Sequence, residues 1–432
     1  MNGTGVGGNR TPTGGTGGAN LLAVRSHNTA LVLDLLRAAG TDGISRLELA
    51  ERTGLTPQAV SKITARLREE GLAAEAGHRA STGGKPRTVL RLVPDAGHAV
   101  GVHLDRDELR TVLADLTGTV VTERRTPIDL GVGADGVIEA VVGEVGAVAA
   151  GVGPGGAGAG ARGAAGSGVR SVTGVGSGTA GAGEASPGGT SDPDYPRGTP
   201  DPGHPIGTPA LLGVGIALPG PLDHLRGVLH RVTGFPEWDG FPLRDALMRR
   251  LGVPVVVDKD TNAAALGLAL GGGVAPDGSS FAYLHLGTGL GAGLVLGGAL
   301  HRGARTGAGE FGHQVVQLDG PPCGCGNRGC VEALCLAAVA RGDLAEAARV
   351  LGTGAGNLVA LLDVDLVLLG GRTVTDAPGP FVRGVAAILD TRAHRTGEPP
   401  IPVRAAPAGV AEGAAQLVLA PLFGRAPLTC AP

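Results

Sequence analysis

Apolar side chains recur at helical spacing three times between residues 28 and 71, a pattern that predicts three helices. The first predicted helix covers residues 28–39. The second begins at a capping box formed by Ser45 and Glu48, and Gly54 is placed to end it. Its inward-facing side chains are predicted to be Leu47, Leu49 and Ala50.

The third predicted helix has the clearest boundaries of the three. Thr56 caps its start, Pro57 takes the first helical position, and Gly71 follows its end. Two short strands joined by the basic, glycine-rich segment HRASTGGKPR come next. Three helices followed by a hairpin is the element order of a winged helix-turn-helix, which we place at residues 21–95. The buried stripe of the third helix is predicted to be Val60, Ile63 and Leu67.

A different pattern follows residue 96. Strands are predicted over residues 98–130 and a helix over 133–150, and from residue 210 strands such as VPVVVD and FAYLHL alternate with helical stretches. That alternation predicts an α/β domain over residues 96–424. Two segments lack any such period because Gly, Ala, Ser, Thr and Pro dominate them. We therefore expect a disordered tail at residues 1–20 and a disordered insertion at 151–209.

Net charge, the length of apolar runs and the spacing of the cysteines limit the kinds of protein that this chain can be. The chain has 432 residues with a net charge of −3, which argues against a protein that binds nucleic acid over its whole surface. It has no run of about 18 apolar residues and no secretory signal, so we expect a cytoplasmic protein without a membrane span. Three of the five cysteines lie within eight residues, and this spacing favours a metal site over a disulfide framework.

The third predicted helix carries polar residues on the side opposite its apolar stripe. In a winged helix-turn-helix the first turns of this helix enter the major groove. Residues 21–95 hold eleven Lys and Arg against eight Asp and Glu, a local basic excess in an acidic chain. The alternative is a solvated helical bundle used for protein contacts. The predicted DNA contacts are Gln58, Ser61, Lys62 and Arg66 on the helix, and Arg79, Lys85 and Arg87 on the wing.

The segment GHQVVQLDGPPCGCGNRGCVE contains a possible metal site. Its three thiols and one imidazole suit tetrahedral zinc without an open coordination position, which is typical of a structural site. The alternative is a set of packed free cysteines. Cys335 and Cys430 do not sit at ligand spacing, so we take them as ordinary thiols. The predicted zinc ligands are His313, Cys323, Cys325 and Cys330.

Two further features have open interpretations. The turn Gly287-Thr288-Gly289 lets backbone N–H groups approach a phosphate, but a tight hairpin turn explains the same glycines. Asp260 lies between a predicted strand and a predicted helix, where α/β sheets place ligand and catalytic groups. It could equally be the N-cap of that helix.

Together, several segments resemble the ROK family of repressors and sugar kinases. They are the cysteine loop with GAGEFGH before it, GTGLGAGLVLGGALHRGARTGAGE, GIALPGPLD and DKDTNAAALG. With its amino-terminal winged helix, the chain is similar to the family's transcriptional regulators over about residues 28–150 and 210–424. The resemblance implies a two-lobed actin/hexokinase-type fold that binds a sugar in the cleft.

The resemblance also implies roles for individual residues. The family's catalytic base falls on Asp260, and its sugar-hydroxyl contacts fall on Glu310, His313 and Glu332. His313 would then serve both sugar and zinc. The family's nucleotide-binding positions fall on Gly287, Thr288, Gly289, Gly370 and Gly371.

The chain departs from the family's kinases at two places. Where they have a glycine-rich loop that holds the phosphates of ATP, this chain has GVHLDRDELR, and Asp105 and Asp107 would repel a phosphate. Where the family usually has Asn before the catalytic Asp, this chain has Lys259, which removes an amide that would contact the sugar.

These observations predict a sugar-responsive transcriptional regulator of the repressor type that acts on carbohydrate genes and is not an enzyme. Its expected partners are a double-stranded operator with an inverted repeat, a sugar or sugar-phosphate effector, and a second copy of the chain in a homodimer or larger homo-oligomer. Two alternatives stay open. One is an ATP-dependent sugar kinase that uses Asp260 as base, and the other is a DNA-binding dimer that ignores sugars.

Overall fold

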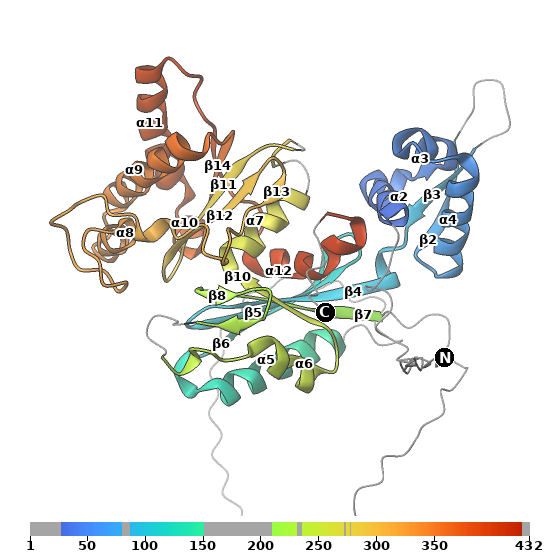
Figure 1. The fold of residues 1–432 in the computed structure, drawn as a ribbon, viewed down its shortest axis with the longest axis horizontal. Helices are drawn as coiled ribbons and strands as arrows, with labels where there is room; N and C mark the ends of the chain where they lie inside the picture. Colours follow the sequence, from blue (N-terminus) through green and yellow to red (C-terminus); the bar gives the residue numbers. More distant parts are fainter. Residues whose placement is uncertain are drawn as a thin grey trace, which may run out of the picture.

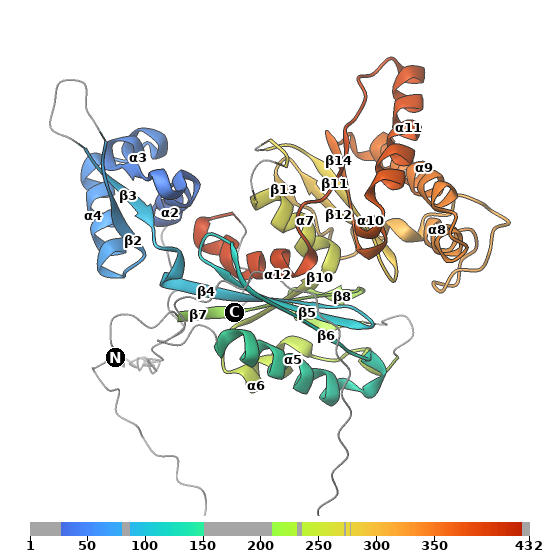
Figure 2. The same ribbon diagram turned by 180° about the vertical axis from the view of Figure 1, so that it is seen from behind.

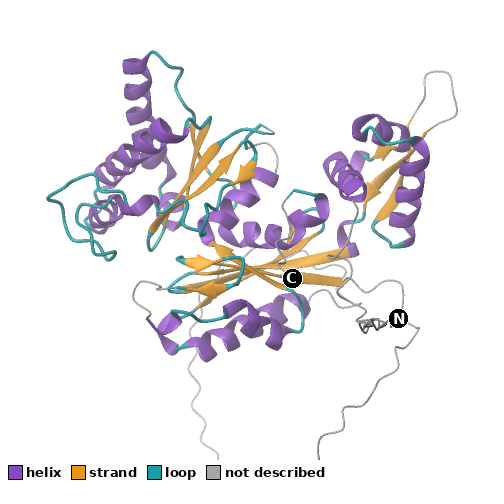
Figure 3. Cartoon of the chain, viewed as in Figure 1, coloured by secondary structure: helices purple, strands orange, loops and turns teal. Residues whose placement is uncertain are grey.

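A computed structural model describes most of the chain outside its glycine-rich segments. The predicted tail at residues 1–20 and the predicted insertion at 151–209 lie outside the described residues. Figures 1 and 3 show a small amino-terminal domain beside two α/β lobes, each built around its own sheet. The described residues are 27–79, 87–150, 210–230, 236–271, 274–276 and 278–425.

The amino-terminal domain consists of three helices and a three-stranded antiparallel sheet. The helices are α2 (His27–Ala39), α3 (Arg46–Thr53) and α4 (Pro57–Glu69). The sheet has the order β1-β3-β2, with strands Ile44–Ser45, Arg87–Leu92 and Ala73–Arg79. The predicted succession of three helices and a hairpin is confirmed, and β1 adds a short strand before α3.

The predicted capping residues make the expected hydrogen bonds. The Ser45 hydroxyl accepts from the Glu48 N–H at 3.3 Å, and the Glu48 carboxylate accepts from the Ser45 N–H at 2.8 Å. The Thr56 hydroxyl accepts from the Ala59 N–H at 3.2 Å at the start of α4. Gly54 ends α3 in the left-handed conformation, with φ of 70°. The local signals in the sequence therefore fix these helix ends.

One predicted inward side chain is wrong. Leu47 is 42% exposed, whereas Leu49 and Ala50 are buried as predicted. Residues two apart on a helix point in nearly opposite directions, so Leu47 and Leu49 cannot both face the core. On α4, Val60 and Leu67 are buried as predicted, while Ile63 is only partly buried.

The first lobe is built on a five-stranded sheet of order β10-β7-β4-β5-β6. Strands β4, β7 and β10 run parallel, and β4, β5 and β6 form an antiparallel meander. Helices α5 and α6 cover one face and α12 covers the other, as Figures 1 and 2 show. The bounds are β4 (Gly97–Leu104), β5 (Glu108–Asp115), β6 (Val120–Pro127), α5 (Ala134–Ala149), β7 (Ala210–Leu218), β8 (Leu222–Asp223), β9 (Val228–Leu229), α6 (Leu243–Leu251), β10 (Val255–Lys259) and α12 (Val410–Leu419).

The second lobe has a sheet of order β13-β12-β11-β14-β15. Along β11 the side chains alternate: Ala282, Leu284 and Leu286 join the core under α8, α9 and α11, while Phe281 and Tyr283 join the core under α7 and α12. The bounds are α7 (Asp260–Leu270), β11 (Phe281–Leu286), β12 (Leu290–Leu296), β13 (Ala299–Leu300), α8 (Val331–Ala340), α9 (Leu344–Leu362), β14 (Leu366–Gly370), α10 (Arg372–Asp376), α11 (Pro378–Thr396) and β15 (Val403–Ala405).

Helix α12 joins the two lobes although it comes last in the chain. Its backbone lies directly on Gly101 of β4 and Gly215 of β7, where a Cβ atom would overlap Ala411 and Ala414. Its Gly413 also lies against α7, since a Cβ atom at Gly267 would be 2.8 Å from the Gly413 Cα. The predicted two-lobed α/β fold is therefore confirmed. Among the described residues, no helix has the length and apolar character needed to cross a membrane.

Candidate sugar cleft, metal cluster and DNA-binding surface

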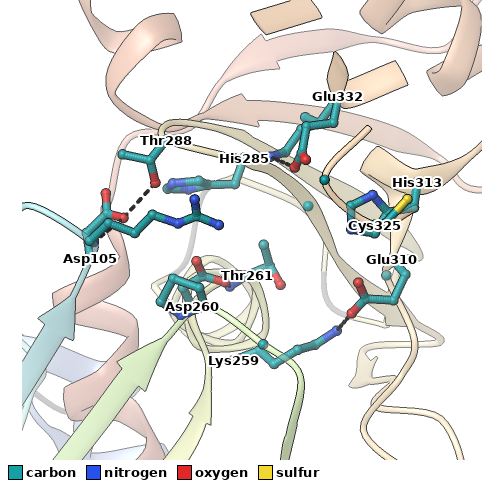
Figure 4. A pocket seen from close by; sticks show the side chains of 18 residues that line it. Asp105, Lys259, Asp260, Thr261, His285, Thr288, Glu310, His313, Cys325 and Glu332 are labelled. Atoms are coloured by element: carbon teal, nitrogen blue, oxygen red, sulfur yellow. Dashed lines mark hydrogen bonds and ion pairs between the residues drawn. The ribbon is translucent and has the colours of Figure 1, made fainter. Parts of the chain in front are cut away.

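A cleft lies between the two lobes, and the four predicted sugar contacts, Asp260, Glu310, His313 and Glu332, line it. It is bounded by the turn after β4, the end of β10, the start of α7, the turn between β11 and β12, and the loop before α8. Figure 4 shows side chains from both lobes turned toward this space. The polar lining residues are Asp105, Arg106, Lys259, Asp260, Thr261, His285, Thr288, Glu310, His313, Cys325 and Glu332.

Asp260 is the first residue of α7, directly after the buried strand β10. Its carboxylate accepts a 2.6 Å hydrogen bond from the Thr261 N–H and faces the cleft (Figure 4). The N-cap alternative for Asp260 is wrong, because Lys259 occupies the N-cap position. The carboxylate is therefore placed at the carboxyl end of a parallel strand, where α/β sheets bind ligands.

Lys259 contacts Glu310 across the cleft, a pairing that the sequence did not predict. The Lys259 side chain is only 4% exposed, and its ammonium donates to the Ala308 carbonyl at 2.6 Å and to Glu310 Oε1 at 3.1 Å. Glu310 Oε2 has no hydrogen-bond partner within the described part of the chain. Lys259 therefore holds the Glu310 carboxylate in place while one of its oxygens stays available.

His313 and Glu332 reach the cleft from the far side of the second lobe. His313 ends a short 3₁₀ turn (Phe311–His313), and Glu332 lies in the first turn of α8. Glu332 Oε2 accepts from the Leu290 N–H at 2.8 Å, which ties α8 to the start of β12. Three carboxylates, those of Asp260, Glu310 and Glu332, thus line one cavity, and carboxylates are acceptors for pairs of hydroxyl groups.

The four predicted metal ligands come together at this wall of the cleft, and two of them, His313 and Cys325, line it. Their ligand atoms, from His313, Cys323, Cys325 and Cys330, all lie within 4.8 Å of one another. Cys325 Sγ is 3.7 Å from Cys330 Sγ, and Cys323 Sγ is 3.7 Å from His313 Nδ1. A tetrahedron with metal–sulfur bonds of about 2.3 Å has edges of about 3.8 Å. The cluster can hold a metal ion, and its donor set and spacing fit one.

Where the turn after β4 meets the second lobe, side chains of the two lobes bind each other. Thr288, in the turn between β11 and β12, donates to Asp105 Oδ1 at 2.8 Å. Arg372, at the start of α10, donates two 3.0 Å hydrogen bonds to Asp107. Sequence reasoning placed Asp105 and Asp107 here but missed Arg372, which lies 265 residues further along the chain. The two carboxylates therefore occupy the side-chain donors of Thr288 and Arg372.

Gly370 and Gly371 have a packing role in this structure. A Cβ atom at Gly370 would overlap the Tyr283 ring, and one at Gly371 would overlap the Leu286 backbone. Gly371 also has a φ of 89°, which L side chains rarely adopt. These contacts let β14 and α10 approach β11 closely. A nucleotide-binding role for the two glycines stays a prediction.

Two titratable groups beside Asp260 have shifted pKa values. Burial is the main cause that lowers the pKa of His103 to about 4, although the charge of Asp260 acts in the opposite direction. Its Nε2 atom is buried without a hydrogen-bond partner within the described residues. Burial would raise the pKa of Asp105, but His103, the Arg106 N–H and the Thr288 hydroxyl together lower it. At neutral pH the buried His103 is therefore neutral, and Asp105, which lines the cleft, is ionised.

The His103 shift predicts a loss of stability in mild acid. The unfolded chain protonates this imidazole below pH 6.5, whereas the folded chain does so only below about 4, so stability falls as the pH drops between these values. A shift of this size corresponds to about 3 kcal/mol. We measure the free energy of unfolding by chemical denaturation at pH 7 and at pH 4. Between these pH values wild type should lose more of it than His103→Gln does, by up to that amount. Parallel curves for the two proteins would contradict the assignment.

The predicted DNA-contacting side chains of α4 share one exposed face. Gln58, Ser61, Lys62 and Arg66 are all exposed. Arg66 pairs with Glu70 one turn later at 2.7 Å, and Lys62 has no ion-pair partner among the described residues. On the wing, Arg87 is exposed, whereas the Arg79 side chain and Lys85 lie outside the described residues.

Comparison with known proteins gives matches in both halves of the chain. A family model described as "Winged helix-turn-helix DNA-binding" matches residues 28–73, and the ROK family model matches residues 207–343. In the solved structures, the chain is similar to a ROK family transcriptional regulator described as a homologue of the E. coli MLC protein. The TM-score is 0.64 at 19% identity, over 93% of this chain and 98% of that one, which supports the fold.

Curated relatives include both regulators and kinases. A putative xylose repressor of Caldicellulosiruptor sp. (strain Rt8B.4) is 26% identical over 313 residues, which is 72% of this chain and 64% of the relative. The glucokinase of Thermotoga maritima is 43% identical over 135 residues, covering 31% of this chain and 42% of the enzyme. The chain thus spans less than two thirds of the length of these relatives.

Proposed function

Because the chain contains a ROK-family domain behind an amino-terminal winged helix-turn-helix, we propose that it is a sugar-responsive, DNA-binding transcriptional regulator, most simply a repressor of carbohydrate genes. One observation carries the proposal: an exposed, basic α4 and a carboxylate-lined cleft belong to one chain, in which a packed core joins the amino-terminal domain to the first lobe and to α12. Similarity to a putative xylose repressor supports it. Its site of action is then the cytoplasm, where the DNA lies.

We place DNA recognition at α4 and the wing, with the domain boundary near residue 95. Lys62 and Arg66 would contact phosphate or guanine, and Gln58 adenine or phosphate. A homodimer would set two copies of α4 in successive major grooves, so the operator should be an inverted repeat with half-sites spaced by whole helical turns. The full proposed set is Gln58, Ser61, Lys62 and Arg66 on α4 with Arg79, Lys85 and Arg87 on the wing.

We place the effector in the cleft, where it would be held by Asp260, Glu310, His313 and Glu332. The three carboxylates can accept hydrogen bonds from sugar hydroxyls. Lys259 supports this role because it fixes Glu310 Oε1 and leaves Oε2 free for a ligand. Where the family's Asn would contact the sugar directly, Lys259 thus acts indirectly, by fixing the Glu310 carboxylate that would contact it.

We propose that the metal cluster holds a structural zinc ion through His313, Cys323, Cys325 and Cys330. Zinc bound by four protein ligands cross-links the chain segments that carry them, and it has no coordination position left for a substrate. Cys330 is the N-cap residue of α8, and Glu332 lies two residues later. Holding Cys330 and His313 together therefore positions both His313 and Glu332 at the cleft.

The kinase alternative rests on Asp260 and on similarity to a glucokinase over 31% of the chain. Asp260 is placed to accept a proton from a sugar hydroxyl. Against this alternative, Asp105 and Asp107 occupy the donors of Thr288 and Arg372 and would repel the phosphates of ATP. ATP turnover that depends on a sugar would revive the kinase.

The proposal is tested by a gel-shift titration of the full chain against DNA upstream of its own gene, at physiological salt. The sugar panel contains xylose, glucose, N-acetylglucosamine and their phosphate esters. A typical coupling of about 1–3 kcal/mol changes operator affinity roughly 5- to 150-fold. Asp260→Asn should keep operator binding and lose the response. Specific binding that ignores every sugar would favour the sugar-independent dimer, and absence of specific binding would reject the regulator.

A further inference from the structure

Helix α7 connects the cleft to the winged helix-turn-helix. Its first residue is Asp260, which lines the cleft, and its last is Leu270. All eight residues from Thr261 to Leu268 are buried, so the helix is surrounded by packed side chains along most of its length. Close-packed interiors transmit displacements with little local relaxation. A shift at the Asp260 end is therefore expected to reach the Leu270 end.

At that far end, a side chain of the DNA-binding domain binds the helix. The carbonyl of Leu270 has no partner within α7, because the last carbonyls of a helix lack intrahelical donors. Arg37, in the last turn of α2, donates to this carbonyl at 3.4 Å. A cation near the carboxyl end of a helix is also favoured by the helix dipole. Arg37 thus caps a helix that belongs to the other domain.

The same guanidinium makes two further contacts. It donates to Asp34 of α2 at 2.9 Å, and it stacks over the Phe423 ring at 5.3 Å. Phe423 ends a 3₁₀ turn (Ala420–Phe423) that follows α12 directly. The Arg37 and Asp34 side chains are only 19% and 13% exposed. Arg37 therefore touches its own helix, the end of α7 and the segment after α12.

Helix α12 packs against α7, so the two contacts that Arg37 makes outside its own domain are connected. Gly413 of α12 packs directly on Gly267 of α7, backbone to backbone. Figures 1 and 2 show α12 between the lobes on the side nearer the amino-terminal domain. Movement of α7 therefore displaces both groups that Arg37 holds outside its own domain. Within that domain, α2 and α4 share one core through Leu33, Leu36 and Leu67.

We propose that Arg37 is the positioning residue that couples the sugar cleft to DNA recognition, through its contacts with Leu270 and Phe423. This inference rests on the proposed function. When a sugar binds Asp260 and moves α7, the Leu270 carbonyl moves against Arg37, and α2 carries α4 with it. Arg37 contacts neither the proposed sugar site nor the proposed DNA-binding residues. It therefore determines how strongly sugar binding changes operator affinity, and not the affinity for sugar or for DNA measured separately.

The test compares Arg37→Met with Arg425→Met in the full-length protein. Methionine keeps an apolar stem beside Phe423 and removes the donors. Arg425 is a matched control because it also pairs with Asp34, at 2.6 Å, and lies two residues after Phe423. Three quantities are measured: sugar affinity by calorimetry, operator affinity without sugar, and operator affinity with saturating sugar. The sugar used is any panel member that changes operator binding of wild type.

We expect Arg37→Met to keep both separate affinities within about threefold of wild type while the sugar-induced change in operator affinity falls to about twofold or less. Arg425→Met should respond as wild type does. An unchanged response in Arg37→Met would overturn the role of Arg37 and leave the proposed function intact. A wild type that binds its operator but ignores every sugar would reject the proposed function and, with it, this inference. Loss of operator binding by Arg37→Met without sugar would also overturn the inference, because Arg37 would then be needed for DNA binding itself.

Discussion

Cys325→Ser is expected to release the metal ion and to destabilise the second lobe strongly. Cys325 is exposed, so replacing sulfur with oxygen costs little by itself. The cluster, however, loses one of four ligands, and structural zinc contributes roughly 10–16 kcal/mol of binding free energy in small zinc domains. We expect a loss of at least about 3 kcal/mol, which lowers the melting temperature by about 10 °C in a lobe of this size. Metal content per chain and thermal unfolding are measured together.

Cys335→Ala is the control for this experiment. Cys335 is buried in α8, and its thiol donates to the Ala347 carbonyl at 3.5 Å, away from the cluster. The variant should lose some stability to the cavity but keep the full metal content. Wild type without bound metal, or Cys325→Ser with unchanged metal content and melting temperature, would refute the metal site. Because His313 and Glu332 are positioned by the same loop, sugar affinity should fall together with metal content.

The metal site was predictable from sequence because its ligands lie within 18 residues of one another. Short spacing limits the geometries that the chain can adopt, so residue types alone indicate tetrahedral coordination. The same holds for the helix ends at Ser45, Gly54 and Thr56, where each hydrogen bond spans at most four residues. Local chemistry determines these features.

The pairings across the cleft were not predictable in the same way. Lys259 and Glu310 lie 51 residues apart, and Asp107 and Arg372 lie 265 apart. Each pair is made by the arrangement of two lobes, and no local pattern selects one partner from many charged residues. The sequence showed that Asp105 and Asp107 are unsuited to phosphate, but only the fold shows which donors they occupy. Arg37 has no distinguishing sequence feature at all.

Exchanging Lys62 and Arg66 for alanine is expected to have the largest effect on operator binding. Each side chain contributes about 1–3 kcal/mol if it contacts a base edge, so the double variant should bind its operator at least about 30-fold more weakly. Lys62 should matter more on its own. Arg66 must leave or share Glu70 to reach DNA. Because this pair is exposed, with 72% of the Arg66 side chain accessible, breaking it takes away only a small part of the Arg66 contribution.

Arg68→Ala is the matched control on the same helix. Arg68 is exposed as well, but it pairs with Glu75 of β2 at 3.0 Å and is not among the proposed contacts. It removes one positive charge from α4, as each of the single variants Lys62→Ala and Arg66→Ala does, so any general electrostatic loss per charge appears in all three. If Lys62 or Arg66 binds phosphate, the loss should be uniform across DNA sequences and the salt dependence should weaken by about one ion per side chain. Equal operator affinity in wild type and the double variant would instead favour a helical domain used for protein contacts.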